Sequence, residues 1–420
     1  MHSPRWLLGS LVALSTLGFF GCEADTDTDT DSVSDDITNP SQGDVRRQAI
    51  GNCWLYAAAS WAEHMHIEAT EDTRQISQSY WTFWHWFDEV QNGWGDEIQT
   101  GGSTWVSNQI IVQRGVMLEA DFVSEDAVAE MSSRQSSALE KMNREVKAGG
   151  RLDSYASKQD RKLVLDVLIE AWQLDDDVAA AVRSTFGDDG SRTFDGGDAD
   201  ATDTLIVAPD AYQVAYPERV TVADVATWKT TTLDVAIEEH RTQSYPSDAD
   251  ARRNFQIRMQ RILHDGAAPV VTWNVDFNAM ESSDPERMGS FNLETLEDTG
   301  GAGRQGGHMT ALHDYEILTE EFGLLQAGVT LDPEDPTDAA KLAAALLPSS
   351  EVRFFRIKNS WGKLRSDRGS APGMPGYHDL YVDYMNGPIR WCPSVEGQKT
   401  EENCNRTTVP FREVLMPPGY

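Results

Sequence analysis

The first half of the chain repeats its apolar residues every three or four positions, which is the spacing of an amphipathic helix. After Cys53 the pattern runs to about His66, through Leu55, Ala58, Ala59, Ala62 and Met65. Ser77 stands where a helix N-cap belongs, ahead of an aromatic-rich stretch. The stretch 106–115 is amphipathic, and two further stretches, 124–147 and 157–186, combine helical spacing with good helix formers. We therefore expect a helical lobe over about residues 46–186.

Farther along, the pattern changes to short alternating or apolar runs, which are typical of strands. The strand candidates are 204–209, 267–275, 308–318, 352–359 and 377–384, and a helix over 254–264 leads into the second of them. An acidic stretch rich in Gly and Asp, about 187–204, is expected to be disordered or a long surface excursion. A helical lobe followed by a strand-rich lobe, about 205–390, predicts the α+β fold class, with a tail over 391–420.

The N-terminus has the features of an export signal. A short positive region, 2–5, precedes an apolar stretch, 6–20, that is too short to span a bilayer as an ordinary helix. The sequence Phe-Phe-Gly-Cys that follows resembles a bacterial lipobox, so residues 1–22 are expected to be a lipoprotein signal peptide with Cys22 lipidated. The alternative is a plain secretory signal that is cut nearby. Residues 23–45 are acidic and nearly free of apolar residues, which predicts a disordered tether to the periplasmic or cell-surface membrane.

Charge and cysteine usage narrow the function further. The chain has 68 acidic and 35 basic residues and a net charge of -33, so its surface repels nucleic acid and anionic lipid. Nucleic-acid binding is therefore not expected, and contact with a membrane is expected only through the lipid anchor at the N-terminus. With Cys22 assigned to lipid, Cys53 is expected to be a free thiol. Cys392 and Cys404 are close in sequence within a polar tail, and outside the cytoplasm they are expected to form a disulfide.

No metal site or cofactor is expected from the sequence. The Asp-Thr repeat over 25–31 lacks the Gly and the distal Glu of a calcium loop. His64 and His66 are two residues apart on an expected helix, so they point to different faces and read as partly exposed structural residues.

Three separated residues offer the chemistry of a cysteine hydrolase. Cys53 is expected at a helix N-terminus, where unpaired N–H groups favour a thiolate. His308, in a Gly-Gly-His-Met stretch, is a candidate base, and Asn359, in Lys-Asn-Ser-Trp-Gly, is a candidate residue to orient it. Cys53 belongs to the helical lobe and the other two belong to the strand-rich lobe. A cleft between the lobes is where such a site would form.

These motifs together resemble papain-like cysteine peptidases, and more closely the bleomycin-hydrolase (aminopeptidase C) branch. The match rests on 51–55, on Leu312 and Tyr315 following His308, and on 358–362. Segments that look like that branch in particular are 77–80 with Phe83-Trp84, Gly101-Gly102 ahead of Trp105, and 114–116. The resemblance covers most of residues 46–385, and it implies a two-lobed papain-like domain over 46–420 that acts on peptide or protein substrates.

The resemblance also implies a role for each residue that matches. Cys53 would be the nucleophile, His308 its general base and then general acid, and Asn359 the acceptor that orients the imidazole. Trp361 would shield that hydrogen bond from water. Gly101 and Gly102 would line the groove that pairs with the substrate backbone, and the backbone N–H of Cys53 would be one oxyanion donor.

One departure from the family leaves the activity open. The oxyanion glutamine of the family lies six residues before the cysteine, whereas here Gln48 lies five before it and Arg47 takes the sixth place. Either a shorter loop still lets Gln48 reach the site, or the oxyanion hole is incomplete. A catalytically inactive papain-like domain that binds peptides or proteins is therefore the alternative to a peptidase. Acyl transfer by the same three residues is a third possibility.

Overall fold

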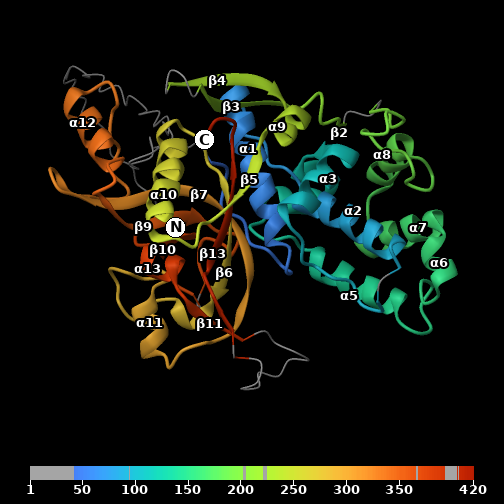
Figure 1. Ribbon diagram of the computed structural model, residues 1–420. Helices are drawn as coiled ribbons and strands as arrows, with labels where there is room; N and C mark the ends of the chain where they lie inside the picture. Colours follow the sequence, from blue (N-terminus) through green and yellow to red (C-terminus); the bar gives the residue numbers. More distant parts are fainter. Residues whose placement is uncertain are drawn as a thin grey trace, which may run out of the picture. The chain divides into compact units, whose positions relative to one another are not determined.

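The computed structural model describes residues 42–93, 95–201, 205–220, 225–365, 368–392, 404 and 406–420. The expected signal peptide, its lipidation site Cys22 and most of the expected tether lie outside these residues. Within them, no helix combines the length and the apolar character needed to cross a bilayer. The chain is α+β, as predicted, with a helical N-terminal region and an antiparallel, sheet-rich C-terminal region (Figure 1).

Side-chain caps mark the start of several helices. The α-helices are α1 (Cys53–Thr70), α2 (Gln78–Gln91), α3 (Thr104–Arg114), α4 (Glu119–Phe122), α5 (Gln135–Val146), α6 (Tyr155–Gln159), α7 (Arg161–Trp172), α8 (Asp176–Phe186), α9 (Leu233–Glu239), α10 (Ala249–His264), α11 (Leu293–Asp298), α12 (Pro336–Ala345) and α13 (Val382–Asn386), with 3₁₀ turns η1 (Ser124–Val128) and η2 (Phe277–Ala279). Ser77 caps α2 as predicted, because its hydroxyl accepts from the N–H of Tyr80 at 3.1 Å.

Two of the expected helices are broken into shorter ones. The stretch 124–147 is η1 followed by α5, and the stretch 157–186 is divided among α6, α7 and α8. The breaks have local causes: Ser154 and Ser157 form a capping box that starts α6, and the Asp160 side chain accepts from Leu163 N–H and starts α7. Gln173 then ends α7 in the left-handed conformation, with φ 52°.

The strands gather mainly in one antiparallel sheet. They are β1 (Val116–Met117), β2 (Ile206–Val207), β3 (Gln213–Val220), β4 (Val225–Thr232), β5 (Arg241–Ser244), β6 (Val270–Asp276), β7 (Gln305–Thr319), β8 (Gly323–Leu325), β9 (Glu351–Lys358), β10 (Tyr377–Tyr381), β11 (Ile389–Trp391), β12 (Arg406–Thr408) and β13 (Phe411–Met416). The seven-stranded sheet has the order β10-β9-β7-β6-β13-β5, and β8 pairs with β7. The other strands form the two-stranded ladders β1-β2, β3-β4 and β11-β12.

The segment 391–420, expected to be a tail, contributes to the core of the sheet. Its strand β13 lies between β6 and β5, with Val414 opposite Val271 on one side and Gln243 on the other. Val414 is fully buried. Nearer the end, the Tyr420 hydroxyl donates to Asp265 Oδ2 at 2.6 Å.

The acidic stretch after α8 is ordered in its described part, 187–201, and the expectation of disorder is wrong for it. Arg114 is buried, and its Nη1 donates to the carbonyls of Gly190 at 3.1 Å and Arg192 at 3.0 Å. The same guanidinium lies 4.0 Å from the centre of the Trp84 ring. The buried guanidinium of Arg114 therefore fixes this surface loop through its backbone carbonyls.

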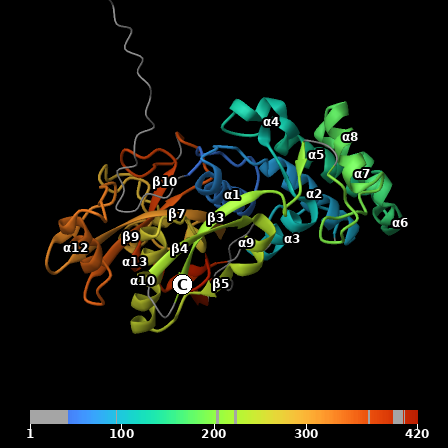
Figure 2. The same cartoon turned by 90° about the horizontal axis from the view of Figure 1, so that it is seen from above.

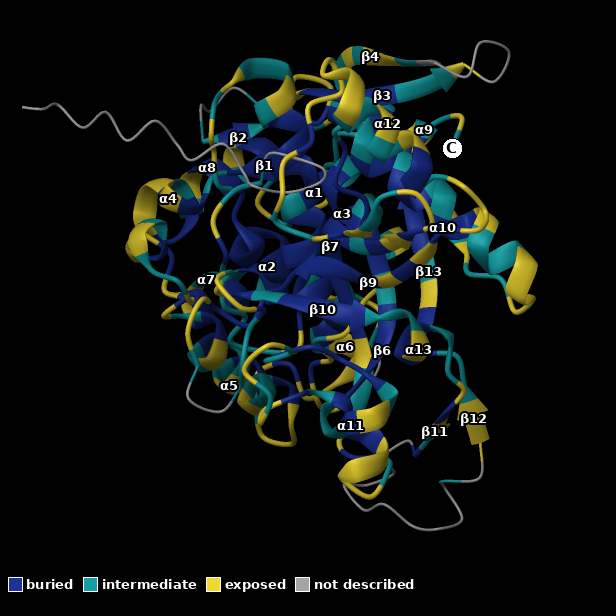
Figure 3. Ribbon diagram, turned by 90° about the vertical axis from the view of Figure 1, so that its left-hand side faces the viewer, coloured by how far each residue is buried: buried dark blue, intermediate teal, exposed yellow. Residues whose placement is uncertain are grey.

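Helix α1 connects the helical and sheet-rich regions, which positions the candidate site. Figure 2 shows it between α2 and strand β7, and it packs against both. Its residues from Trp54 to Met65 are buried with one partial exception, Ser60. In Figure 3, α2 and β10 are likewise dark blue along most of their length. The N-terminus of α1 is therefore held by well-packed structure on both sides.

Candidate active site

Cys53 is the first residue of α1, as predicted, and it is buried. The side chain of Asn52 does not cap the helix; its Nδ2 donates to Thr82 Oγ1 at 3.0 Å and to Gln135 Oε1 at 3.3 Å. These bonds fix the turn that carries the thiol. Burial raises the pKa of the Cys53 thiol, and hydrogen bonds from backbone N–H groups, including those of Cys53 and Trp54, oppose the shift only in part.

His308 lies buried on β7, and Asn359 follows directly after β9, the neighbouring strand. The imidazole Nε2–H donates to Asn359 Oδ1 at 2.8 Å. That oxygen also accepts from the N–H of Ser360 at 2.7 Å, which fixes the orientation of the amide. The indole of Trp361 stacks on the imidazole, with 4.8 Å between ring centres and 20° between planes. Because Nε2 carries the proton in this arrangement, Nδ1 is the basic nitrogen of neutral His308.

Burial lowers the pKa of His308 to about 4, and the hydrogen bond to Asn359 opposes that shift. The Cys53 thiol meets the same strand. Burial has the largest effect on the Cys53 pKa, and the second largest is a hydrogen bond from the backbone N–H of Met309, which lowers it. Met309 directly follows His308. The fold therefore brings the thiol to the segment of β7 that carries the imidazole, from positions 255 residues apart in the sequence.

Gln48 is anchored to the segment that orients His308. Its backbone N–H donates to the Ser360 carbonyl at 2.9 Å, and its Oε1 accepts from Ser360 Oγ at 2.7 Å. Its Nε2 donates to the Ile50 carbonyl at 2.7 Å, which occupies one of the two amide hydrogens. Neighbouring Arg47 forms backbone bridges with Trp361 and Met131. Gln48 thus lies at the site, with one N–H left over from its bonds to described residues.

The expected groove glycines lie beside the start of α1. Gly102 packs flat on the Trp54 indole, so closely that a Cβ there would be 2.3 Å from the ring. Trp54 Nε1 donates to the Thr100 carbonyl at 3.0 Å, which ties this segment to α1. Gly101 is exposed, and a Cβ there would meet nothing within 4 Å. An open stretch of backbone next to Cys53 suits the predicted pairing with substrate, which stays a prediction.

Sequence reasoning missed two buried groups of opposite charge behind the site. Glu63 of α1 and Lys358 of β9 line a small cavity together with Met309 and Asn359. Burial raises the pKa of Glu63 to about 7 and lowers that of Lys358 to about 8. Lys358 Nζ has no hydrogen-bond partner among the described residues. Nothing in the spacing of the two residues indicates that α1 and β9 bring them together.

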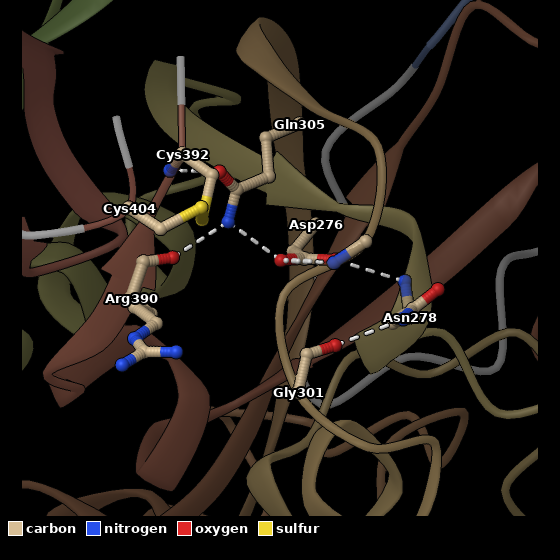
Figure 4. The surroundings of a disulfide bond; sticks show 8 residues. Asp276, Asn278, Gly301, Gln305, Arg390, Cys392 and Cys404 are labelled. Atoms are coloured by element: carbon tan, nitrogen blue, oxygen red, sulfur yellow. Dashed lines mark hydrogen bonds between the residues drawn. A yellow bond between two sulfur atoms is a disulfide. The ribbon is translucent and has the colours of Figure 1, made fainter. Parts of the chain in front are cut away.

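A disulfide joins Cys392 and Cys404, the pair expected from the sequence. Figure 4 shows how its surroundings are tied to the sheet. Gln305 Oε1 accepts from the Cys392 N–H at 2.7 Å, while its Nε2 donates to Asp276 Oδ2 at 2.6 Å and to the Arg390 carbonyl at 2.7 Å. One side chain therefore links the disulfide to the facing ends of β6 and β7.

Histidines and carboxylates within the described ranges form no group suited to a metal ion. His64 and His66, expected to be partly exposed, are both buried. His66 Nδ1 bonds the Gln213 carbonyl at 2.7 Å, and its ring stacks on Tyr212. His66 therefore packs against β3, and both histidines belong to the buried part of the structure.

No model of a protein family matches the sequence, and no curated protein matches it either. Among solved structures, the crystal structure of PepW from Lactobacillus rhamnosis HN001 (DR20) is similar to this chain, with a TM-score of 0.39 and 11% sequence identity. The match covers 92% of this chain and 82% of that one. Functional conclusions therefore rest on the side chains of the site.

Proposed function

We propose that this protein is a papain-like cysteine peptidase that hydrolyses peptide bonds through a thioester on Cys53. The observation that carries the proposal is the 2.8 Å hydrogen bond from His308 Nε2 to Asn359 Oδ1 beneath the Trp361 ring. It presents Nδ1 of the imidazole as a base, on the strand segment that the Cys53 thiol also meets. A nucleophile, a base and a residue that orients the base are the parts that acyl transfer requires.

The reaction follows from these positions. The Cys53 sulfur attacks the peptide carbonyl as its proton passes to His308 Nδ1, and the carbonyl oxygen becomes an oxyanion. The backbone N–H of Cys53 and the remaining N–H of Gln48 would stabilise that charge. The C–N bond then breaks, the imidazolium protonates the departing amine, and a thioester remains. Water, deprotonated by His308, attacks the thioester and releases the acid and the free thiol.

Burial decides how the thiol becomes reactive. A lone thiolate or a lone imidazolium is disfavoured here, because burial raises the Cys53 pKa and lowers the His308 pKa to about 4. Moving one proton from the thiol to the imidazole makes both charges at once, and each then compensates the other. We therefore expect the reactivity of Cys53 to depend on His308 over the whole pH range below the thiol pKa.

Thiol labelling tests this dependence. A peptidyl epoxide should label Cys53 of the wild-type protein between pH 5 and 7, and Cys53→Ala should remove the label. In His308→Ala the thiol pKa stays raised, so less thiolate exists at any given pH, and labelling at pH 7 should be at least about 10²-fold slower. It should recover only above the ordinary thiol pKa of about 8.5. Equal labelling of the two proteins at pH 7 would mean that Cys53 is not activated by His308.

An inactive, peptide-binding domain is the second candidate, and one observation favours it. Gln48 Nε2 already donates to the Ile50 carbonyl, so the amide is not wholly available to an oxyanion. Digestion of a peptide mixture, followed by mass spectrometry, separates the candidates. Cleavage products that the wild-type protein forms and Cys53→Ala does not form support the peptidase. Rapid labelling of Cys53 without any cleavage products supports the inactive, peptide-binding domain.

We also propose that the protein is exported and held at the periplasmic or cell-surface membrane through lipid on Cys22. Support comes from the apolar stretch 6–20, the lipobox-like residues that follow it, and a disulfide, which persists in oxidising compartments.

A further inference from the structure

A second buried imidazole contacts the Trp361 indole, and the proposed reaction does not use it. His378 lies in β10 and is only 2% exposed. Its ring centre is 5.2 Å from that of Trp361, with 71° between the planes. Trp361 stacks on His308 at 4.8 Å, so one indole contacts both imidazoles. The Phe291 ring, 6.2 Å from Trp361 and 6.0 Å from His378, packs against the same pair and leaves the indole little freedom to move.

A hydrogen bond fixes the orientation of the His378 ring. Nδ1–H donates to the Gly289 carbonyl at 2.8 Å, and because a carbonyl only accepts, Nδ1 carries the proton of the neutral ring. The acceptor is itself held in place, since the Gly289 N–H donates to the Glu281 carbonyl at 2.9 Å. A Cβ on Gly289 would be 2.7 Å from the carbonyl carbon of Gly369, so these two segments touch. An apolar side chain at position 378 could fill the same space but could not be tied to this segment.

Strand β10 also holds the residue that orients His308. The backbone N–H of Asn359 donates to the Gly376 carbonyl at 3.0 Å, and Gly376 directly precedes β10. His378, two residues farther on, lies opposite Ile357 of β9, the strand that ends next to Asn359. The same strand therefore fixes the backbone of Asn359 and, through His378, contacts the indole that covers the bond from His308 to Asn359.

The His378 ring is uncharged at neutral pH. Burial lowers the pKa of His378 to about 4, and the charge of Arg368 also lowers it. The carboxylate of Asp379, next along β10, is bound to Arg356 at 2.7 Å. A proton on His378 would oppose the imidazolium that His308 forms during the reaction. Burial is the main cause of the low His308 pKa, and repulsion from a charged His378 adds to it.

We propose that His378 is a positioning residue for this reaction. It holds the Trp361 indole against the His308 imidazole, and the indole in turn keeps His308 Nε2 in line with Asn359 Oδ1. The inference rests on the proposed peptidase function, because the position of His308 matters only if His308 acts as the base. A base displaced by about 1 Å can cost on the order of 10²-fold in rate, so a small movement of the indole is enough to affect the reaction.

Labelling of Cys53 by a peptidyl epoxide tests this role. His378→Ala removes the ring and its hydrogen bond, and labelling at pH 7 should slow by about 10- to 100-fold. His378→Asn places an amide N–H near the position of Nδ1 and should restore most of the rate. His240→Ala is the matched control and should leave the rate unchanged, because the buried His240 ring likewise bonds a carbonyl, that of Ala236 at 2.8 Å, and contacts Trp61 at 5.0 Å. A wild-type labelling rate in His378→Ala would overturn the inference.

Histidine NMR on the Cys53→Ala protein gives a readout that does not depend on turnover. Because the Asn of His378→Asn cannot carry charge, the His308 pKa should rise in that variant, whereas a residue needed only for folding would leave it unchanged. Equal titration of His308 in the two proteins would overturn the inference. If labelling and titration differ as expected but no protein in the series cleaves peptides, the proposed peptidase is wrong and the action of His378 on His308 stands. Melting temperatures identify a misfolded variant, and His378→Asn supplies the test if His378→Ala does not fold.

Discussion

At the scale of single residues, Gln48 is held by its neighbours although it lies one position closer to Cys53 than the oxyanion glutamine of the family that the sequence resembles. The amide is held between Ser360 Oγ and the Ile50 carbonyl, and its backbone N–H reaches the Ser360 carbonyl. The side chain is thereby fixed to the residues that follow Asn359, while one amide hydrogen is left over from its bonds to described residues. A donor fixed in advance stabilises developing charge better than a mobile one, because it needs no reorganisation.

Replacing this residue measures its share in catalysis. Gln48→Ala should lower kcat by about 10²–10³-fold with little change in KM, the loss found when one oxyanion donor is removed. Ser360→Ala is the matched control, because it releases Oε1 but keeps the Nε2 donor, and it should cost less. If Gln48→Ala leaves kcat unchanged, backbone N–H groups supply the whole oxyanion hole.

The sequence predicted the residues of the site that belong to motifs, and missed those that meet only in three dimensions. Cys53, His308 and Asn359 each stand in a recognisable local pattern. Asn52 and Gln135 are 83 residues apart, and their hydrogen bond follows from the packing of α1 against other helices. Glu63 and Lys358 gave no signal either, since only the fold brings them to one cavity.

At the scale of elements, β13 gives the clearest contrast between expectation and structure. Its six residues, Phe411–Met416, follow a polar, cysteine-bearing stretch, and that context predicted a tail. Pairing with both β6 and β5 makes it an inner strand of the sheet. Long strands with clear alternation, such as β7 and β9, were predicted close to their bounds. The short, mostly exposed strand β5 was missed, because exposed or brief strands carry little periodic pattern. The β3-β4 hairpin was missed as well.

A buried charge in β13 should destabilise the whole sheet. Val414→Asp places a carboxylate in a fully buried position without a partner, and it should lower the free energy of unfolding by about 3–5 kcal/mol. Urea unfolding, followed by circular dichroism, measures the loss. Arg412→Gln on an exposed position of the same strand should change stability by less than about 0.5 kcal/mol. A comparable small effect for Val414→Asp would show that the strand is dispensable.

At the scale of the whole molecule, the proposed anchor and the acidic surface belong together. A net charge of -33 keeps the chain soluble and repels anionic lipid, so attachment to a membrane would depend on the acyl chains alone. Expression in a bacterial host should give a mature protein whose N-terminal peptide begins at Cys22 and carries the mass of a lipid. Cys22→Ser should release the protein from the membrane fraction. A mature N-terminus elsewhere, without lipid, would indicate a plain secretory signal.

The central place of β13 also determines when the chain could first become reactive during its synthesis. Cys53 leaves the ribosome early. His308 lies on β7, which pairs with β6, and β6 has its second neighbour in β13, near residue 414. We expect β7 to become ordered only after that late strand arrives, so that the nascent polypeptide would carry a thiol without an ordered base. We expect a growing chain to be unable to digest itself or its neighbours, a safeguard that needs no separate inhibitory segment.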